Sequence, residues 1–289
     1  MATHTLASTQ PQTRRRAPSL ALVVQYAICV FVALLVFVPL FATLMGGLKD
    51  TGELMANPFG LPIPPRIENY TRILNGGEFW MQMANSLWVL LGSVFISVVA
   101  SAMAAFVFAR LSFRGRDGLF NFINLGLLFP LAVAILPLYI QLRNMGLLDS
   151  LPGVFLPQAA FSLPTNILIL RNFFRSIPAE LEDAAYIDGC TTAGFFWRIL
   201  LPLARPALAT VAVLVMVASW NNFLLPLLVL NNQSLWTLPM GVMKFSGEHG
   251  IEWGPILAFV TLALIPAITL YLLAQRQLIA GLTSGAVKG

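Results

Sequence analysis

Four carboxylates lie close together in one short stretch of an otherwise apolar chain. Glu180, Glu182, Asp183 and Asp188 fall within nine residues, although the whole sequence holds only 12 acidic residues. Carboxylates among small and aromatic side chains suit pairing with basic groups of a partner protein, because such neighbours supply buried contact area. Residues 176–206 are therefore predicted to form a docking surface, with the acidic groups in docking and capping roles rather than catalytic ones.

The first part of this docking surface is predicted to be a short helix. Ser176 can cap it, and Pro178 suits its first turn, where a missing N–H has no intrahelical partner. The helix then presents one narrow face of mostly small side chains, at the spacing i, i+3, i+4 and i+7. Its members are Leu181, Ala184, Ala185 and Asp188. Gly189 follows where a left-handed helix cap would be placed.

A second short helix should follow. Thr191 or Thr192 can cap it, and Pro202 ends or bends it. It carries an apolar group made of Phe195, Phe196, Trp197 and Ile199. An interfacial helix pair resting on lipid is the alternative, but such helices are usually rich in Lys and Arg rather than acidic.

The rest of the chain has the composition of a membrane protein. It is 58% hydrophobic and 10% charged, whereas soluble domains carry about 25% charged residues. Six uncharged runs are long enough for helices that cross the hydrocarbon core, which takes about 20 residues. The sequence thus predicts an all-α polytopic protein with six transmembrane helices and a cytoplasmic two-helix loop.

The expected segments follow from the charges and prolines. The first span is residues 19–44, and the other five, residues 83–108, 119–142, 152–170, 207–230 and 255–273, lie within a transmembrane domain at 79–276. The other segments are tails at 1–18 and 274–289, an outer arm at 49–82 and the docking loop at 176–206. Most of the 17 Lys and Arg residues share one side if the spans alternate. The positive-inside rule makes that side, with both termini and the docking loop, cytoplasmic.

Polar side chains inside the spans are few. Asn221 and Asn222 lie in the fifth expected span, and Gln158 lies in the fourth. Amides at membrane depth must face protein or water. They either join helices by hydrogen bonds or line a route for a hydroxyl-rich solute, since amides both donate and accept.

A spaced motif in the docking loop resembles the signature loop of bacterial ABC importer permeases. Asp183, Ala184 and Ala185 are followed after three residues by Gly189 and after nine more by Ile199-Leu200-Leu201-Pro202. Asp183 stands where the pattern has Glu, with Glu182 beside it. The chain is most similar to the second permease subunit of maltose-type carbohydrate importers, also through Trp220-Asn221-Asn222-Phe223 and the ending from Gly281.

The resemblance implies a type I ABC importer fold and a set of partners. These are a second homologous permease, two ATPase subunits that use ATP and Mg, an extracytoplasmic sugar-binding protein and the sugar itself, in a bacterial or archaeal cytoplasmic membrane. The coupling loop would include Glu182, Asp183, Ala184, Ala185, Gly189, Ile199 and Pro202. The outer loop, residues 231–252, would contact the binding protein, with Trp236, Gly241 and Gly247 as candidates.

Other classes of function fit less well. The chain has no Gly-Lys pair and so no phosphate-binding loop of a P-loop ATPase, which places the energy source in a partner. A stand-alone carrier or channel for a neutral polar solute is the alternative, but ion-coupled carriers ordinarily need ionisable groups inside their spans. A membrane enzyme is disfavoured because both histidines lie outside the spans, and no metal or nucleic-acid site is expected.

Overall fold

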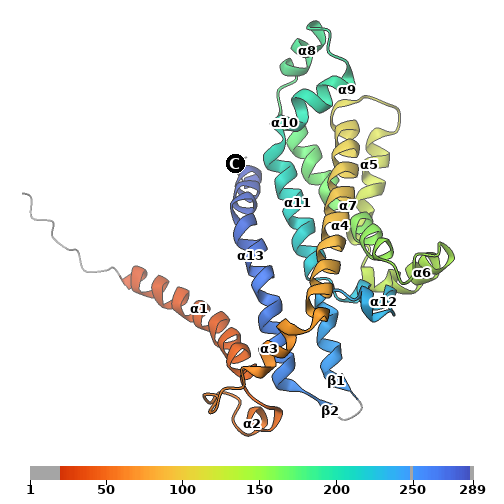
Figure 1. Ribbon diagram of the computed structural model, residues 1–289. Coiled ribbons are helices and arrows are strands. Elements are labelled where there is room, and N and C mark those ends of the chain that lie inside the picture. The colour runs from red at the N-terminus through yellow and green to blue at the C-terminus, as the bar shows by residue number, and fades with distance from the viewer. Residues whose placement is uncertain (1–19, 248–249, 287–289) are drawn as a thin grey trace, which may run out of the picture.

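The chain forms a bundle of long helices with short elements at both ends (Figure 1). The structure is a computed structural model that describes residues 20–247 and 250–286. The expected tail at 1–18 and the last residues, 287–289, lie outside the described residues. The long helices are α1 (Leu20–Gly46), α4 (Gly77–Arg110), α7 (Leu151–Ser176), α11 (Arg205–Trp220) and α13 (Trp253–Ala286).

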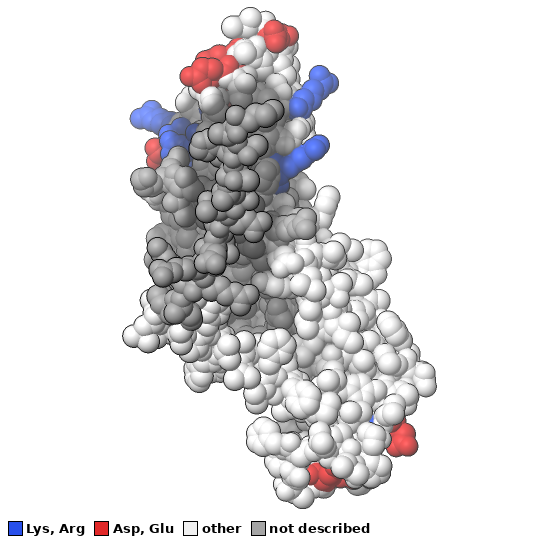
Figure 2. Space-filling view, turned by 90° about the vertical axis from the view of Figure 1, so that its left-hand side faces the viewer, with Lys and Arg blue, Asp and Glu red and all other residues white. Residues whose placement is uncertain are grey.

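Short elements lie at opposite ends of this bundle (Figure 1). At one end are α8 (Glu180–Ile187), α9 (Thr192–Phe195), a π-helical turn (Phe196–Leu200) and α10 (Leu201–Leu203). Those at the other end include α2 (Thr51–Ala56), α3 (Glu68–Asn75), a 3-10 helix η4 (Leu238–Phe245) and the hairpin of β1 (Ser246–Gly247) and β2 (Gly250–Ile251). On the described part of the face in Figure 2, charged side chains lie toward these two ends, and the described surface between them is uncharged.

The helical membrane fold is confirmed, whereas the number of spans stays a prediction. Within the described residues, four helices are long and apolar enough to cross a membrane, or up to six if each of two bent helix pairs is one span. The four are α1, α4, α7 and α13, the last counted to Gln275. α13 continues to Ala286, so most of the expected tail at 274–289 is helical.

The third expected span, residues 119–142, is not one helix. α5 (Arg116–Asn124) and a 3-10 turn (Leu125–Leu128) are bent by 106° relative to α6 (Leu131–Asn144). The bend has a local cause in Pro130, because a proline disfavours helical dihedrals in the residue before it. Phe129 is accordingly extended, with φ −92° and ψ 109°.

The fifth expected span, residues 207–230, is also interrupted. α11 ends at Trp220, and a separate α12 (Leu224–Val229) follows. Pro226 lies in the first turn of α12, where its missing N–H has no intrahelical partner. Asn222 Oδ1 accepts a hydrogen bond from Leu225 N at 3.1 Å. Proline and asparagine together thus favour a new helix start over a continuous span.

The fourth span is more regular than its prolines suggested. α7 is one helix from Leu151 to Ser176 and contains Pro157 and Pro164. It packs along the small side chains of α4, where Ser97 is fully buried and Ser97 Oγ lies 2.6 Å from Ser162 Oγ. Small side chains thus form a packing face on α4, and this close contact supports α7 despite the two missing donors.

The outer arm is partly ordered by its own contacts. It contains the short helix α3, and its last expected residues already belong to α4, which begins at Gly77. Lys49 is fully buried, and its Nζ donates to the carbonyl of Asn57 at 2.7 Å. Lys49, a charged residue expected in an exposed outer loop, is instead buried and stabilises the arm.

Candidate functional site

The acidic helix α8 begins later than the sequence predicted. Its cap is Ala179, which provides no side-chain hydrogen bond, and Glu182 N and Asp183 N both donate to the carbonyl of Ala179. The prediction that Ser176 caps this helix is wrong, because Ser176 ends α7 and its Oγ donates to the carbonyl of Phe173 at 2.7 Å. Glu180, Glu182 and Asp183 do lie in the first turn, near the positive end of the helix dipole.

Arg110, the last residue of α4, connects α8 to two spans. Its Nη2 donates to the carbonyls of Phe174 and Ile177, each at 2.7 Å, and its Nη1 lies 3.4 Å from Glu182 Oε2. Both side chains of this ion pair are mostly buried, with exposed fractions of 8% and 13%. Tyr186 also donates to Glu182 Oε1, at 2.9 Å. Glu182 is therefore held by its own chain rather than presented to a partner.

A second arginine joins the same end of the bundle. Arg171 Nε donates to the carbonyl of Phe108 at 3.2 Å, and its guanidinium lies 3.9 Å from the ring centroid of Phe120. Its Nη2 lies 3.6 Å from Asp117 Oδ1. Arg110 and Arg171 thus fasten α4, α5, α7 and α8 to one another. In the sequence, these arginines were distinguished only by their position near helix ends, which is typical of residues that contact lipid headgroups. Nothing there indicated their contacts with other helices.

The face that α8 offers to solvent is narrower than predicted. Asp183 and Ala184 are exposed, whereas Ala185 is only 6% exposed and packs in the apolar core below α8. Leu181 is also exposed. Because Ala185 is buried, the two motif alanines have different surroundings, and Ala184, with Asp183 beside it, is the one available for contact.

The turn after α8 has the geometry that the sequence indicated. Gly189 has a φ of +79°, and a Cβ built on it would have no atom within 4 Å. The requirement for glycine here is conformational rather than steric. Thr191 then caps α9, since its Oγ1 accepts from Gly194 N at 3.1 Å. The left-handed cap and the threonine cap are both confirmed.

The aromatic group of the second short helix divides between core and surface. Phe195 and Phe196 are 0% and 5% exposed and belong to the core, so they cannot supply contact area to a partner. Trp197 and Ile187 are 59% and 86% exposed at the same end of the molecule. Within the docking surface, the exposed side chains therefore include Asp183, Ala184, Ile187 and Trp197.

A π-helical turn contains both Phe196, which lies in the core, and Trp197, which lies at the surface. Leu201 N donates to the carbonyl of Phe196, five residues back. Pro202, which is exposed in α10, has no N–H for the usual bond, and such turns often lie at functional sites. Ile199 packs against the core, and the segment from α9 to α10 meets α11 at 76°.

Gln158 forms an interhelical contact, one of the two roles that the sequence left open for the amides. Its Oε1 accepts hydrogen bonds from Ser93 Oγ at 2.9 Å and from Ser219 Oγ at 2.7 Å. These residues belong to α7, α4 and α11. One amide therefore joins three helices just before the break in the fifth span.

The two asparagines at that break bond locally. Asn221 is exposed, and its Nδ2 donates to the carbonyl of Val217 at 2.9 Å in the last turn of α11. Asn222 caps α12 as described above. The structure thus brings neither amide against another long helix, and it separates a capping residue from an exposed one.

The outer loop, residues 231–252, is fastened to α4 and to the turn before α7. Asn85 Nδ2 donates to the carbonyls of Ser234 and Trp236 at 2.9 and 3.1 Å. Asp149 Oδ1 accepts from the backbone of Asn231 and Asn232, and these bonds from Asn232 and Asn231 lower the pKa of the Asp149 carboxyl. The loop is thereby held in a fixed place at the end opposite α8.

The three loop residues singled out by sequence do not form one group. Trp236 and Gly241 line a pocket with residues from α3, α4 and α13. Gly247 lies in the β1–β2 hairpin, paired with Gly250. Residues 248 and 249, which include His249, are outside the described part of the chain. Among the described residues, no group of three or more His, Cys, Asp and Glu side chains could hold a metal ion.

The fold and the fastened end helices define a multi-pass helical membrane protein, and comparison with known proteins identifies its family. Residues 93–284 match the family described as binding-protein-dependent transport system inner membrane component. The chain belongs to this family. It is accordingly a permease subunit of an ABC importer and not an enzyme.

Two curated relatives are similar over most of their length. The diacetylchitobiose uptake system permease protein NgcG of Streptomyces coelicolor is 33% identical over 267 residues, covering 92% of this chain and 88% of that protein. The trehalose transport system permease protein SugB of Mycobacterium tuberculosis is 39% identical over 231 residues, covering 79% and 84%.

The fold has a solved counterpart. A chain in the crystal structure of a bacterial ABC transporter for the import of the acidic polysaccharide alginate aligns with a TM-score of 0.78 at 23% identity. The alignment covers 92% of this chain and 99% of that one. The predicted type I ABC importer transmembrane fold is confirmed.

Proposed function

We propose that this permease moves a saccharide across the cytoplasmic membrane by alternating access, driven by ATP hydrolysis in a partner. Relatives named for diacetylchitobiose, trehalose and arabinooligosaccharides support a carbohydrate substrate. The observation that carries the coupling role is the attachment of α8 through Arg110 to the ends of α4 and α7. A push on α8 is thereby transmitted to two long helices at once.

The proposed sidedness places the α8 end in the cytoplasm. Arg110, Arg114, Arg116, Arg171 and Arg175 gather there, as the positive-inside rule requires. The docking surface, with exposed carboxylates at Glu180, Asp183 and Asp188 and exposed Trp197 and Ile187, fits a cleft with basic and apolar walls. Two ATPase subunits that bind ATP and Mg would supply this cleft. A second permease would lie alongside, and a saccharide-binding protein would bind at the opposite end.

Purification and transport together test this function. The chain, tagged and isolated from its native membrane, is expected to carry with it an ATPase and a second permease. Vesicles holding that complex and the binding protein should take up a labelled saccharide only when ATP is present on the cytoplasmic side. Saccharide transport by the chain alone in liposomes would instead establish the stand-alone carrier.

The two asparagines at the helix break are expected to differ in their effects. We propose that exposed Asn221 lines the saccharide route, so Asn221→Ala should raise the KM of uptake by about five- to tenfold, the loss of roughly one hydrogen bond. Asn222→Ala should lower the yield of assembled complex, because α12 loses a cap that contributes about 1 kcal/mol.

Asn222→Asp is the matched control for that pair, since aspartate also caps helices. It should restore assembly, and uptake kinetics measured on equal amounts of complex separate the two roles. A wild-type KM in Asn221→Ala would remove Asn221 from the route.

A further inference from the structure

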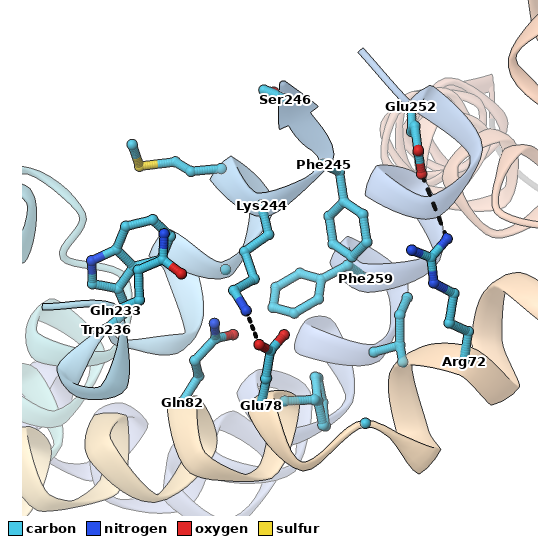
Figure 3. A pocket seen from close by; sticks show the side chains of 15 residues that line it. Arg72, Glu78, Gln82, Gln233, Trp236, Lys244, Phe245, Ser246, Glu252 and Phe259 are labelled. Carbon is cyan, nitrogen blue, oxygen red and sulfur yellow. Dashed lines mark ion pairs between the residues drawn. The ribbon is translucent and has the colours of Figure 1, made fainter. Parts of the chain in front are cut away.

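A pocket of about 450 Å³ lies at the end of the molecule opposite α8. Its walls come from α3 and α4 on one side and from residues 233–246, Glu252 and the start of α13 on the other (Figure 3). Small-molecule sites commonly have volumes of roughly 300–1,000 Å³. The pocket is therefore large enough for one or two sugar rings.

A buried amide provides the polar group of this pocket. Gln82 is only 1% exposed, and its Oε1 has no hydrogen-bond partner among the described residues. A buried unpaired oxygen is unfavourable unless a ligand or water completes it. Gly241 lies directly beside this amide, since a Cβ there would collide with Gln82 Oε1 and with the ring of Phe259. The absence of a side chain at 241 thus leaves room for the amide and the ring.

The charged groups around the pocket are matched in pairs. Lys244 forms an ion pair with Glu78, and Arg72 Nη1 lies 3.8 Å from Glu252 Oε2 (Figure 3). Each cation thus already faces a carboxylate, so the pairs add no net charge to the pocket. A neutral ligand needs no counter-charge, whereas an anionic one would find both of these cations already paired.

Aromatic rings form the apolar part of the wall. Phe259 lies edge-on to Phe79, with ring centroids 5.6 Å apart, and 5.8 Å from Phe245. Trp236 lies on the opposite side of Lys244 from these rings (Figure 3). A sugar ring has apolar C–H faces and a rim of hydroxyls, so it can pack on aromatic rings while its rim bonds to an amide.

We propose that this pocket binds a neutral saccharide unit at the outer end of the permease. Gln82 accepts a hydrogen bond from a sugar hydroxyl, the half-buried Phe245 ring packs on the sugar face, and the paired charges leave an acidic sugar no unpaired cation among the lining residues. The inference rests on the proposed function for the class of ligand. It adds that this subunit itself holds the saccharide, at the outer ends of α4 and α13.

Direct binding to the assembled complex tests the site. The purified complex in nanodiscs, without the binding protein, is titrated by calorimetry with trehalose, diacetylchitobiose or arabinotriose, whichever it takes up fastest in vesicles. The wild type should bind this neutral probe, and Gln82→Leu should weaken binding by about tenfold through loss of one hydrogen bond in a buried site. Gln25→Leu, the same change on α1 away from the pocket, should leave the affinity unchanged.

A reversal of ligand preference gives a result that misfolding cannot produce. Glu78→Gln leaves Lys244 without its carboxylate, so digalacturonate should bind at least about fivefold more tightly than to the wild type. Lys244→Gln has the opposite charge change and should give no such gain. A gain of affinity requires a folded pocket.

The outcomes separate this inference from the function on which it rests. Saccharide uptake without measurable binding to the wild-type complex would overturn the pocket and leave the importer intact. Wild-type affinity in Gln82→Leu, or an unchanged preference in Glu78→Gln, would overturn it as well. Absence of uptake for every saccharide tested would overturn the proposed function instead.

Discussion

Arg110→Ala is expected to lower ATP-driven saccharide uptake by about tenfold or more while ATP hydrolysis continues. The substitution removes two hydrogen bonds to the carbonyls of Phe174 and Ile177 and leaves the mostly buried Glu182 without its cation. Breaking such a pair costs about 3 kcal/mol or more. Because the lost contacts are those that join α8 to α4 and α7, nucleotide-driven movement of α8 should no longer reach these two helices. The ratio of saccharide transported to ATP hydrolysed measures the effect.

Arg114→Ala is the matched control, because Arg114 is an exposed arginine only four residues away. It should leave the ratio near that of the wild type, and co-purification of the ATPase should show that both variants assemble. A double-mutant cycle with Glu182→Ala isolates the pairwise energy. Coupling in Arg110→Ala equal to that in Arg114→Ala would mean that α8 acts without this connection.

Gly189→Val is expected to be the second severe change, with uptake reduced several-fold or more. The residue has a φ of +79°, which costs a residue with a side chain about 1–2 kcal/mol and a β-branched one more. The strain can be relieved only by moving α8 relative to α9, which displaces Asp183 and Ala184 on the docking surface. Uptake and ATP hydrolysis in reconstituted vesicles are the measurements.

Gly189→Asn distinguishes the backbone from the space around it. Asparagine tolerates the left-handed conformation, and within the described chain nothing lies within 4 Å of the added Cβ. Asn should therefore retain most of the uptake that Val loses. Equal loss in both variants would show that a partner occupies the space beside Gly189, so that side-chain size and not backbone conformation decides.

Much of the fold could be predicted from the sequence because it follows from local properties. The long uncharged runs and the charge asymmetry indicated a helical membrane protein. Gly189 was identified as a helix cap and Thr191 as one of two candidates, because capping there follows residue type and position along the chain. The spaced motif from Asp183 to Pro202 indicated the permease family, to which the chain belongs.

Other features depended on contacts between residues distant in the sequence. Ser176 was a plausible cap, but α7 extends through it, since its packing against α4 supports a longer helix. Gln158 rather than Asn221 joins the helices, because only the folded bundle brings Ser93 and Ser219 to one amide. Such hydrogen bonds leave no periodic pattern in the chain, and sequence reasoning could not assign them.

The sequence by itself determined the membrane class, the family and the place of the coupling segment, because hydropathy, charge and motif spacing are properties of the chain. Only the tertiary structure decided which side chains of that segment are available. Ala185, Phe195 and Phe196 turn into the core and Glu182 pairs with Arg110, while Asp183 stays exposed. The physical reason is that burial and ion pairing depend on what lies opposite a residue, here the ends of α4 and α7.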